Sequence, residues 1–103
     1  MMYKLIFAPA FAADLQETFA YIETTLAVPQ ASRTLMQEID RAISLLKEQP
    51  FLYPFCPEPL NALQYRKIVV RQYILIYYVD EAAQTVNLLR CFHGNQNYLH
   101  YFR

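Results

Sequence analysis

Residues 65–79 read Tyr65-Arg66-Lys67-Ile68-Val69-Val70-Arg71-Gln72-Tyr73-Ile74-Leu75-Ile76-Tyr77-Tyr78-Val79. Apart from three cations and one glutamine, the stretch consists of apolar and aromatic residues, which are enriched in β-strands. It predicts two adjacent strands, Tyr65–Val70 and Gln72–Val79. The turn near Arg71 lacks the usual glycine or asparagine, so the sequence leaves its register open. The second strand is apolar on both faces, which favours a central position in a sheet.

Two further strands are predicted on either side of this stretch. Gln84–Phe92 is a third apolar run after a polar break, so residues 65–92 predict a three-stranded antiparallel meander. Near the N-terminus, Met2–Phe7 reads as one more strand. Gly94 is the only glycine of the chain, and we expect it to hold a backbone angle that other residues avoid.

Two helices are predicted between the first strand and the meander. Pro9 suits a first helical turn, and an apolar stripe at helical spacing follows, formed by Phe11, Leu15, Phe19, Ile22 and Leu26. We expect Asp14 to lie away from that stripe. The second helix begins at Pro29, ends before Pro50 and carries the stripe Leu35, Ile39, Ile43 and Leu46. The short link between the helices implies an antiparallel hairpin, which would cover the sheet.

The predicted fold class is therefore α+β: an N-terminal strand, an antiparallel helical hairpin and a three-strand antiparallel meander. With 103 residues the chain is expected to form a single domain, 1–103, and 55% hydrophobic residues argue against a disordered chain. Residues 50–59 hold four prolines interleaved with aromatic residues. Such proline density excludes regular structure, and the aromatic residues suggest an ordered loop that packs down.

Charge is distributed unevenly along the chain. Residues 1–60 carry four cations and seven anions, whereas residues 61–103 carry five cations and two anions, although the whole chain is neutral. The sheet half could therefore attract an anionic partner. The alternative is a solvated surface whose asymmetry arose by chance.

Several kinds of chemistry find little support in the sequence. Cys56 and Cys91 are expected to be buried core thiols, and the Cys91–His93 pair only a remote candidate for a thiol–imidazole nucleophile. No paired motif of metal ligands is present, so neither a metal nor another cofactor is predicted. The absence of a long apolar run and of a secretory signal predicts a cytoplasmic protein without a membrane segment.

What the sequence does offer is a basic and aromatic group in the C-terminal half. Lys67, Arg71, Arg90, His93 and Tyr98 could act on RNA without a metal, because such cleavage needs a base, an acid and cations that stabilise the phosphorane-like transition state. The alternative is that the cations line the rim of the sheet and His93 hydrogen-bonds a turn. Met36 and Leu45 widen the apolar surface of the second helix. They either pack on the first helix or contact another protein.

The order and spacing of these elements resemble the RelE/ParE superfamily of bacterial toxins. The resemblance covers the whole chain and is strongest at Tyr65–Val69, Tyr73–Tyr77 and the closing Phe92-His93-Gly94. It implies the toxin of a type II toxin–antitoxin module, a plasmid-stabilisation or stress-response system in which a cognate antitoxin covers the toxin. A homodimer or a toxin–antitoxin hetero-oligomer is the assembly it implies. We expect Met36, Leu45, Arg66 and Tyr101 to be partner-binding residues.

The resemblance also implies one of two targets. ParE-like members bind and inhibit DNA gyrase, whereas RelE-like members are metal-independent endoribonucleases that cut messenger RNA on the ribosome. The RelE-like arginine after the tyrosine that opens the middle strand corresponds to Ile74 here, and the arginine expected near Asn95 is absent. The long helical hairpin is similar to ParE. We therefore favour gyrase inhibition over RNA cleavage, with an inactive structural relative as the third reading.

Overall fold

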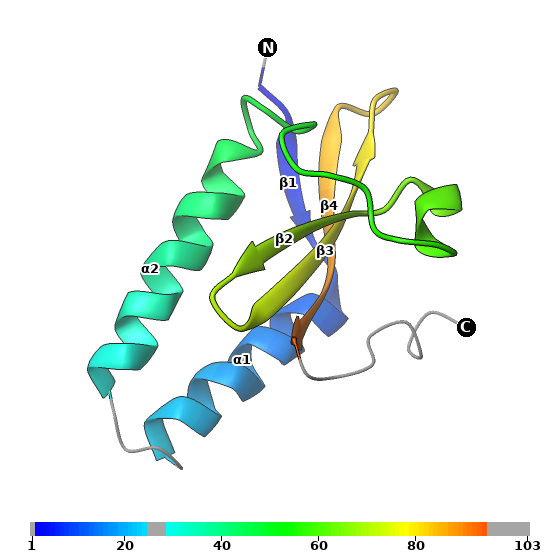
Figure 1. Cartoon of the computed structure of the whole chain (residues 1–103). Helices are drawn as coiled ribbons and strands as arrows, with labels where there is room; N and C mark the ends of the chain where they lie inside the picture. The colour runs from blue at the N-terminus through cyan, green and yellow to red at the C-terminus, as the bar shows by residue number, and fades with distance from the viewer. Residues whose placement is uncertain (1, 25–28, 95–103) are drawn as a thin grey trace.

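The computed structural model of the chain describes residues 2–24 and 29–94, and its order of elements is the predicted one (Figure 1). These elements are β1 (Lys4–Phe7), α1 (Pro9–Thr24), α2 (Pro29–Leu45), the short 3₁₀ helix η1 (Leu60–Leu63), β2 (Arg66–Val70), β3 (Tyr73–Asp80) and β4 (Thr85–His93). The α+β class is confirmed, and strand ends differ from the predicted ones by one or two residues. The link between the helices lies outside the described residues, as do Tyr98 and Tyr101.

The four strands form one mixed sheet in the order β1-β4-β3-β2. β2, β3 and β4 pair antiparallel, which confirms the predicted meander, and β3 has a neighbour on each side as its two apolar faces require. β1 joins the far side of β4 in parallel, from Lys4 opposite Thr85 to Phe7 opposite Leu88. Beyond Leu88, no strand among the described residues pairs with this edge of β4.

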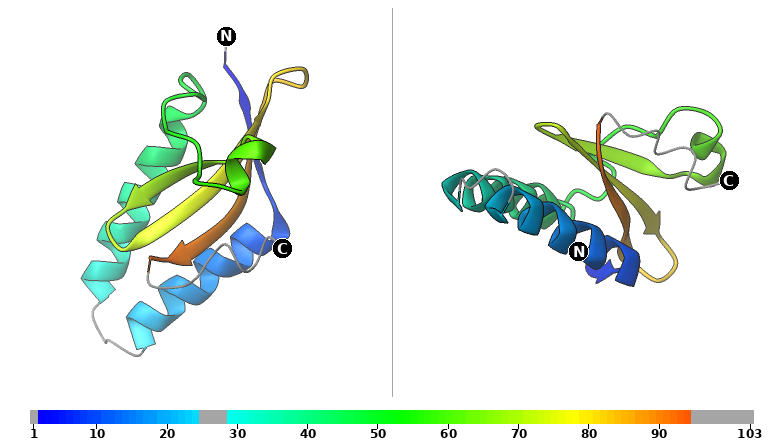
Figure 2. Two further views of the ribbon diagram at one scale, coloured as in Figure 1. Left: turned by 45° about the vertical axis from the view of Figure 1, so that its right-hand side comes forward. Right: turned by 90° about the horizontal axis from the view of Figure 1, so that it is seen from below.

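Both helices lie on one face of the sheet (Figure 2). Apart from Leu26, which lies outside the described residues, their predicted stripes are confirmed in the core, to which α1 and α2 contribute the buried Phe11, Ile22, Leu35, Ile39 and Ile43. These side chains pack on the sheet residues Ile68, Leu75, Tyr77, Val86, Leu88 and Cys91. Helical spacing thus produces a core because each turn presents an apolar side chain to the same sheet.

Residues 50–63, called here the proline-containing segment, cover the opposite face. Cys56 and Leu60 are each 2% exposed and pack with Ile76 and Phe92. The segment also lies along β2: the Cys56 N–H donates to the Tyr65 carbonyl at 2.8 Å and the Lys67 N–H donates to the Pro54 carbonyl at 3.1 Å. The prediction of an ordered loop that packs down is confirmed.

The structure gives the register of the turn near Arg71, which the sequence left open, and the backbone angle of Gly94. Arg71 and Gln72 form the whole connection between β2 and β3, and Arg71 takes the left-handed backbone, φ 55°, that a glycine would adopt more easily. Gly94, by contrast, has no positive φ, so the expectation of a special backbone angle there is wrong. Its N–H donates to the Gln72 carbonyl at 2.6 Å, and a Cβ on Gly94 would come within 3.1 Å of that oxygen. Gly94 therefore suits a close approach of two backbones.

Within residues 2–24 and 29–94, no helix combines the length and apolar character that crossing a membrane requires. In the same ranges, no three His, Cys, Asp or Glu side chains gather closely enough to hold a metal ion.

Candidate functional site

Arg90, a predicted catalytic residue, lies in an ion pair with α1. Its Nε donates to Asp14 Oδ2 at 2.8 Å and its Nη2 donates to Asp14 Oδ1 at 3.1 Å, while the Cys91 N–H donates to Asp14 Oδ2 at 2.9 Å. The Asp14 side chain is only 14% exposed, which corrects its predicted place away from the buried stripe. The carboxylate lies there because the edge of β4 beyond Leu88 leaves a backbone N–H without a strand partner.

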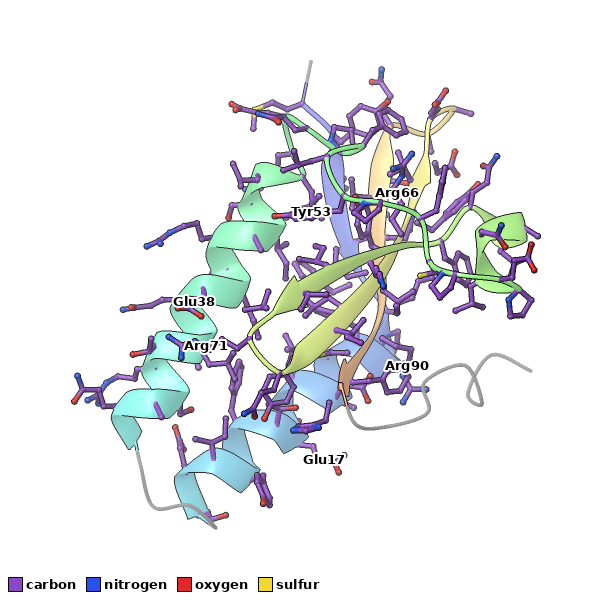
Figure 3. The ribbon with its side chains drawn as sticks, in the orientation of Figure 1. Glu17, Glu38, Tyr53, Arg66, Arg71 and Arg90 are labelled. Atoms are coloured by element: carbon purple, nitrogen blue, oxygen red, sulfur yellow. The ribbon has the colours of Figure 1, made fainter. Side chains whose placement is uncertain are left out.

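Arg71 is paired as well. From the turn between β2 and β3 it reaches Glu38 on α2, with Nε–Oε2 at 2.6 Å and Nη2–Oε1 at 2.9 Å (Figure 3). The hydrogen bonds from Arg71 lower the pKa of the Glu38 carboxyl below its usual range. The pair joins the turn to the second helix and remains largely open to solvent.

Arg66, which we expected at a partner interface, contacts the proline-containing segment. Its Nη1 donates to the Tyr53 carbonyl at 2.6 Å, and its guanidinium carbon lies 4.1 Å from the centre of the Phe55 ring and 5.3 Å from that of Phe51. A guanidinium enclosed by a carbonyl and two rings stabilises the segment that it contacts. The structure thus gives Arg66 an intramolecular role, and contact with a partner stays a prediction.

The strand register divides the predicted catalytic residues between the two faces of the sheet. Lys67 pairs with Ile76, which pairs with Arg90, so these three share a row on the face that the proline-containing segment covers. His93 lies opposite Tyr73 on the helix-covered face, where the rings meet edge to face with centroids 5.4 Å apart. Because Arg90 and His93 are an odd number of residues apart on one strand, they point to opposite faces. Tyr98 lies outside the described residues.

Both cysteine thiols are buried and have raised pKa values. Cys91 is 4% exposed, and burial together with the nearby Asp14 raises the pKa of its thiol to about 12. Burial raises the pKa of the Cys56 thiol to about 11, with Lys67 acting in the opposite direction. Since the thiolate is the nucleophile, both thiols are unreactive at neutral pH while buried, which leaves no support for a Cys91–His93 nucleophile.

Hollows gather around the turn between β2 and β3. A groove of about 650 Å³ lies between α1 and the ends of β3 and β4, and its lining includes Glu17, Tyr21, Tyr73, Arg90 and His93. A second hollow of about 490 Å³ lies between the two helices and the turn, and a third of about 450 Å³ lies on the other side of the turn. Gln72 borders all three. Concave surface of this kind is where binding is expected.

Sequence reasoning missed Glu17 and Tyr21 as groove residues. The signal that could have found them is the composition of α1, which carries three carboxylates and no lysine or arginine. By contrast, Met36 and Leu45, singled out in advance, are 39% and 42% exposed on α2, as a contact with another protein requires.

Solved structures resemble this fold. The toxin–antitoxin complex RelBE2 from Mycobacterium tuberculosis matches with a TM-score of 0.63 and 19% identity, over 90% of this chain and 99% of the other. The chromosomal ParDE toxin–antitoxin system from P. aeruginosa matches with a TM-score of 0.71 and 17% identity, over 89% of this chain and 96% of the other. At such identities the likeness concerns the fold. No curated protein sequence matches the chain significantly.

A family model decides the relationship. The model described as the ParE toxin of the type II toxin–antitoxin system parDE matches residues 5–98, which is nearly the whole chain. The match extends from β1 through the helical hairpin and the complete meander. This chain is therefore a member of the ParE toxin family of type II toxin–antitoxin systems.

Proposed function

We propose that this toxin acts by binding and inhibiting DNA gyrase and that no residue of it cleaves RNA. The observation that carries the proposal is the division of the candidate catalytic residues. Metal-free RNA cleavage needs a base, an acid and a cation around one phosphate. Here Lys67 and Arg90 belong to the sheet face opposite to that of His93, and Arg90 and Arg71 are each held by a carboxylate. Arg90 and His93 both border the groove beside α1, but there Arg90 is paired with Asp14.

The covering of the sheet supports the same proposal. Lys67 and Arg90 are separated by β3, which places their backbones about 10 Å apart at the usual strand spacing. Between them lies Ile76, which is fully buried and packs with Cys56 and Leu60. A phosphate could not reach both cations without displacing the proline-containing segment. The match to the ParE family model, the family whose resemblance implies gyrase, agrees with this argument.

We propose further that a cognate antitoxin neutralises the toxin, as the family description and the two solved toxin–antitoxin systems suggest. The exposed α2 residues Met36 and Leu45 support an apolar contact for it. Met36→Asp and Leu45→Asp should keep the fold, because both side chains are exposed, and should weaken antitoxin binding about tenfold or more. Leu52→Asp, 48% exposed on the proline-containing segment, is the matched control and should bind normally.

The decisive experiment compares the two targets with one protein preparation. Purified toxin should inhibit supercoiling of relaxed plasmid by purified gyrase, and the purified antitoxin should restore it. The same toxin should leave messenger RNA intact in a translating extract. Breaks in the messenger at codon-specific positions, without any effect on supercoiling, would show that the RelE-like alternative is correct. Expression without growth arrest would favour an inactive relative.

A further inference from the structure

The groove between α1 and the ends of β3 and β4 has a distinct chemical character. Asp14, Glu17 and Tyr21 are among the residues that line it from the helix, while Tyr73, Arg90 and His93 line it from the strands. In Figure 3, Glu17 and Arg90 mark the helix side and the strand side of this region. With a volume of about 650 Å³ the groove is the largest of the hollows around the turn.

One negative charge in the groove is uncompensated. Asp14 is neutralised by Arg90 at 2.8 Å, and Glu23 accepts a hydrogen bond from the buried Ser32 at 3.3 Å. Glu17, the third carboxylate of α1, has no hydrogen bond or ion pair among residues 2–24 and 29–94. The helix brings no lysine or arginine to balance it. The groove therefore attracts a cation and repels a phosphate or carboxylate.

Aromatic rings stand beside that carboxylate. Tyr21 is 53% exposed, and Tyr73 is half-buried with the His93 ring edge-on at 5.4 Å. Tyr21 and Tyr73 line the same groove, one from α1 and the other from β3. A planar guanidinium is the group that can pair with a carboxylate and stack on an aromatic face at once. An apolar side chain in this position would leave Glu17 desolvated and unpaired.

We propose that this groove binds an arginine side chain of a partner protein, with its guanidinium paired to Glu17 and stacked on Tyr21. Arginine and tyrosine are the residue types that most often dominate protein interfaces, and a groove of this size admits one long side chain and part of its backbone. The inference goes beyond the proposed function, since it holds whether the arginine belongs to the antitoxin or to the target.

The first test uses a small probe and the folded toxin. The peptide N-acetyl-Gly-Arg-Gly-amide is titrated into labelled toxin and followed by NMR, beside the same peptide with citrulline in place of arginine. Signals of Thr18, Tyr21 and Tyr73 should shift with the arginine peptide, and the citrulline peptide should bind about tenfold more weakly because the charge-assisted bonds are lost. Equal binding of both peptides, shifts confined to another surface, or no shifts at all would each overturn the proposal.

Matched variants assign the binding to Glu17. Glu17→Gln should weaken the arginine peptide about tenfold. Glu48→Gln makes the same charge change three residues beyond the C-terminal end of α2, outside the groove lining, and should leave binding unchanged. Equal losses in the two variants would mean general attraction by net charge, and spermidine binding as tightly as the peptide would mean a site for free cations. Either result would refute an arginine site.

A last arm brings in the macromolecules. Glu17→Gln toxin should lose affinity about tenfold for the antitoxin or for gyrase, measured by titration with each purified partner. If affinity for both is unchanged, the groove does not hold a partner's arginine. The gyrase proposal fails separately, when wild-type toxin leaves supercoiling unaffected while the peptide results stand.

Discussion

The two faces of the sheet are covered by different means. On one face, α1 and α2 present apolar side chains at helical spacing to a continuous core. On the other, residues 50–63 pack the buried Cys56 and Leu60 against the strands and are held as well by backbone hydrogen bonds along β2 and by Arg66. The helix-covered face should therefore carry most of the folding free energy, and the other face should open more readily.

The largest expected effect is at the centre of the helix-covered face. Ile39 is 1% exposed on α2, so Ile39→Asp buries a carboxylate without a partner and should cost about 3–5 kcal/mol. Val69→Asp, where the side chain is 61% exposed, is the control and should fold normally. Urea denaturation followed by circular dichroism measures both. A folded Ile39→Asp variant of wild-type stability would show that the helices contribute less than we infer.

The next effect concerns the contact between α1 and the edge of β4. Asp14→Asn removes the charge that holds Arg90 and weakens the bond to the Cys91 N–H, so it should cost about 2 kcal/mol. Glu17→Gln, a substitution of the same kind on the same helix, should cost less than about 0.5 kcal/mol because that side chain is exposed. Equal costs in denaturation experiments would contradict a structural role for Asp14.

A smaller effect, confined to the other face, is expected from Arg66→Ala. Loss of the bond to the Tyr53 carbonyl and of the contacts with two rings should cost about 1–2 kcal/mol and free residues 50–63. Burial raises the pKa of the Cys56 thiol to about 11, so it reacts only when this segment opens, and its labelling at pH 8 should accelerate about tenfold.

Cys91 serves as the internal control in the same sample. It lies in the helix-covered core, and its labelling should accelerate less than that of Cys56. Mass spectrometry of the two cysteine-containing peptides separates the rates. Equal acceleration would show that both faces open as one cooperative unit.

The smallest effect should come from the exposed pair of Arg71 and Glu38. Arg71→Ala should shift the melting temperature only slightly, because the guanidinium side chain is 59% exposed. Arg71→Gly loses the same pair but relaxes the backbone at φ 55°, so it should melt at a higher temperature than Arg71→Ala. The pKa of Glu38 is lowered in the folded state. The pair therefore stabilises the fold at pH values above the usual pKa of a carboxyl group, and this stabilisation is lost as the pH falls through the lowered pKa. A lower melting temperature for Arg71→Gly would contradict this account of the turn.

Periodicity predicted the elements and the core well, because the apolar stripes that contain Phe11 and Ile39 depend only on the local geometry of a helix. It could not place Asp14, because the helix alone does not reveal that a strand edge with a free N–H lies beside it. The same limit applies to Arg71, whose partner Glu38 is distant in sequence. The role of Gly94 was misjudged because a close backbone contact and a positive φ leave the same trace in a sequence.

The sequence predicted only part of the division of the candidate catalytic residues between the two faces of the sheet. Alternation along β4 separates Arg90 from His93 in any register, but the row joining Lys67, Ile76 and Arg90 depends on the turn that the sequence left open. The groove was not predicted at all, since it forms where α1, the turn and the end of β4 meet.

The pairing of the proline-containing segment with β2 has a consequence for how molecules meet in a crowded cell. Pro54 and Pro57 carry no N–H, and the Cys56 N–H is already donated to Tyr65, so a strand from a neighbouring copy would find a single donor along residues 54–57. Side-to-side growth of the sheet into fibres is thereby blocked at this border, and a chain so rich in strand-forming residues can accumulate without polymerising there.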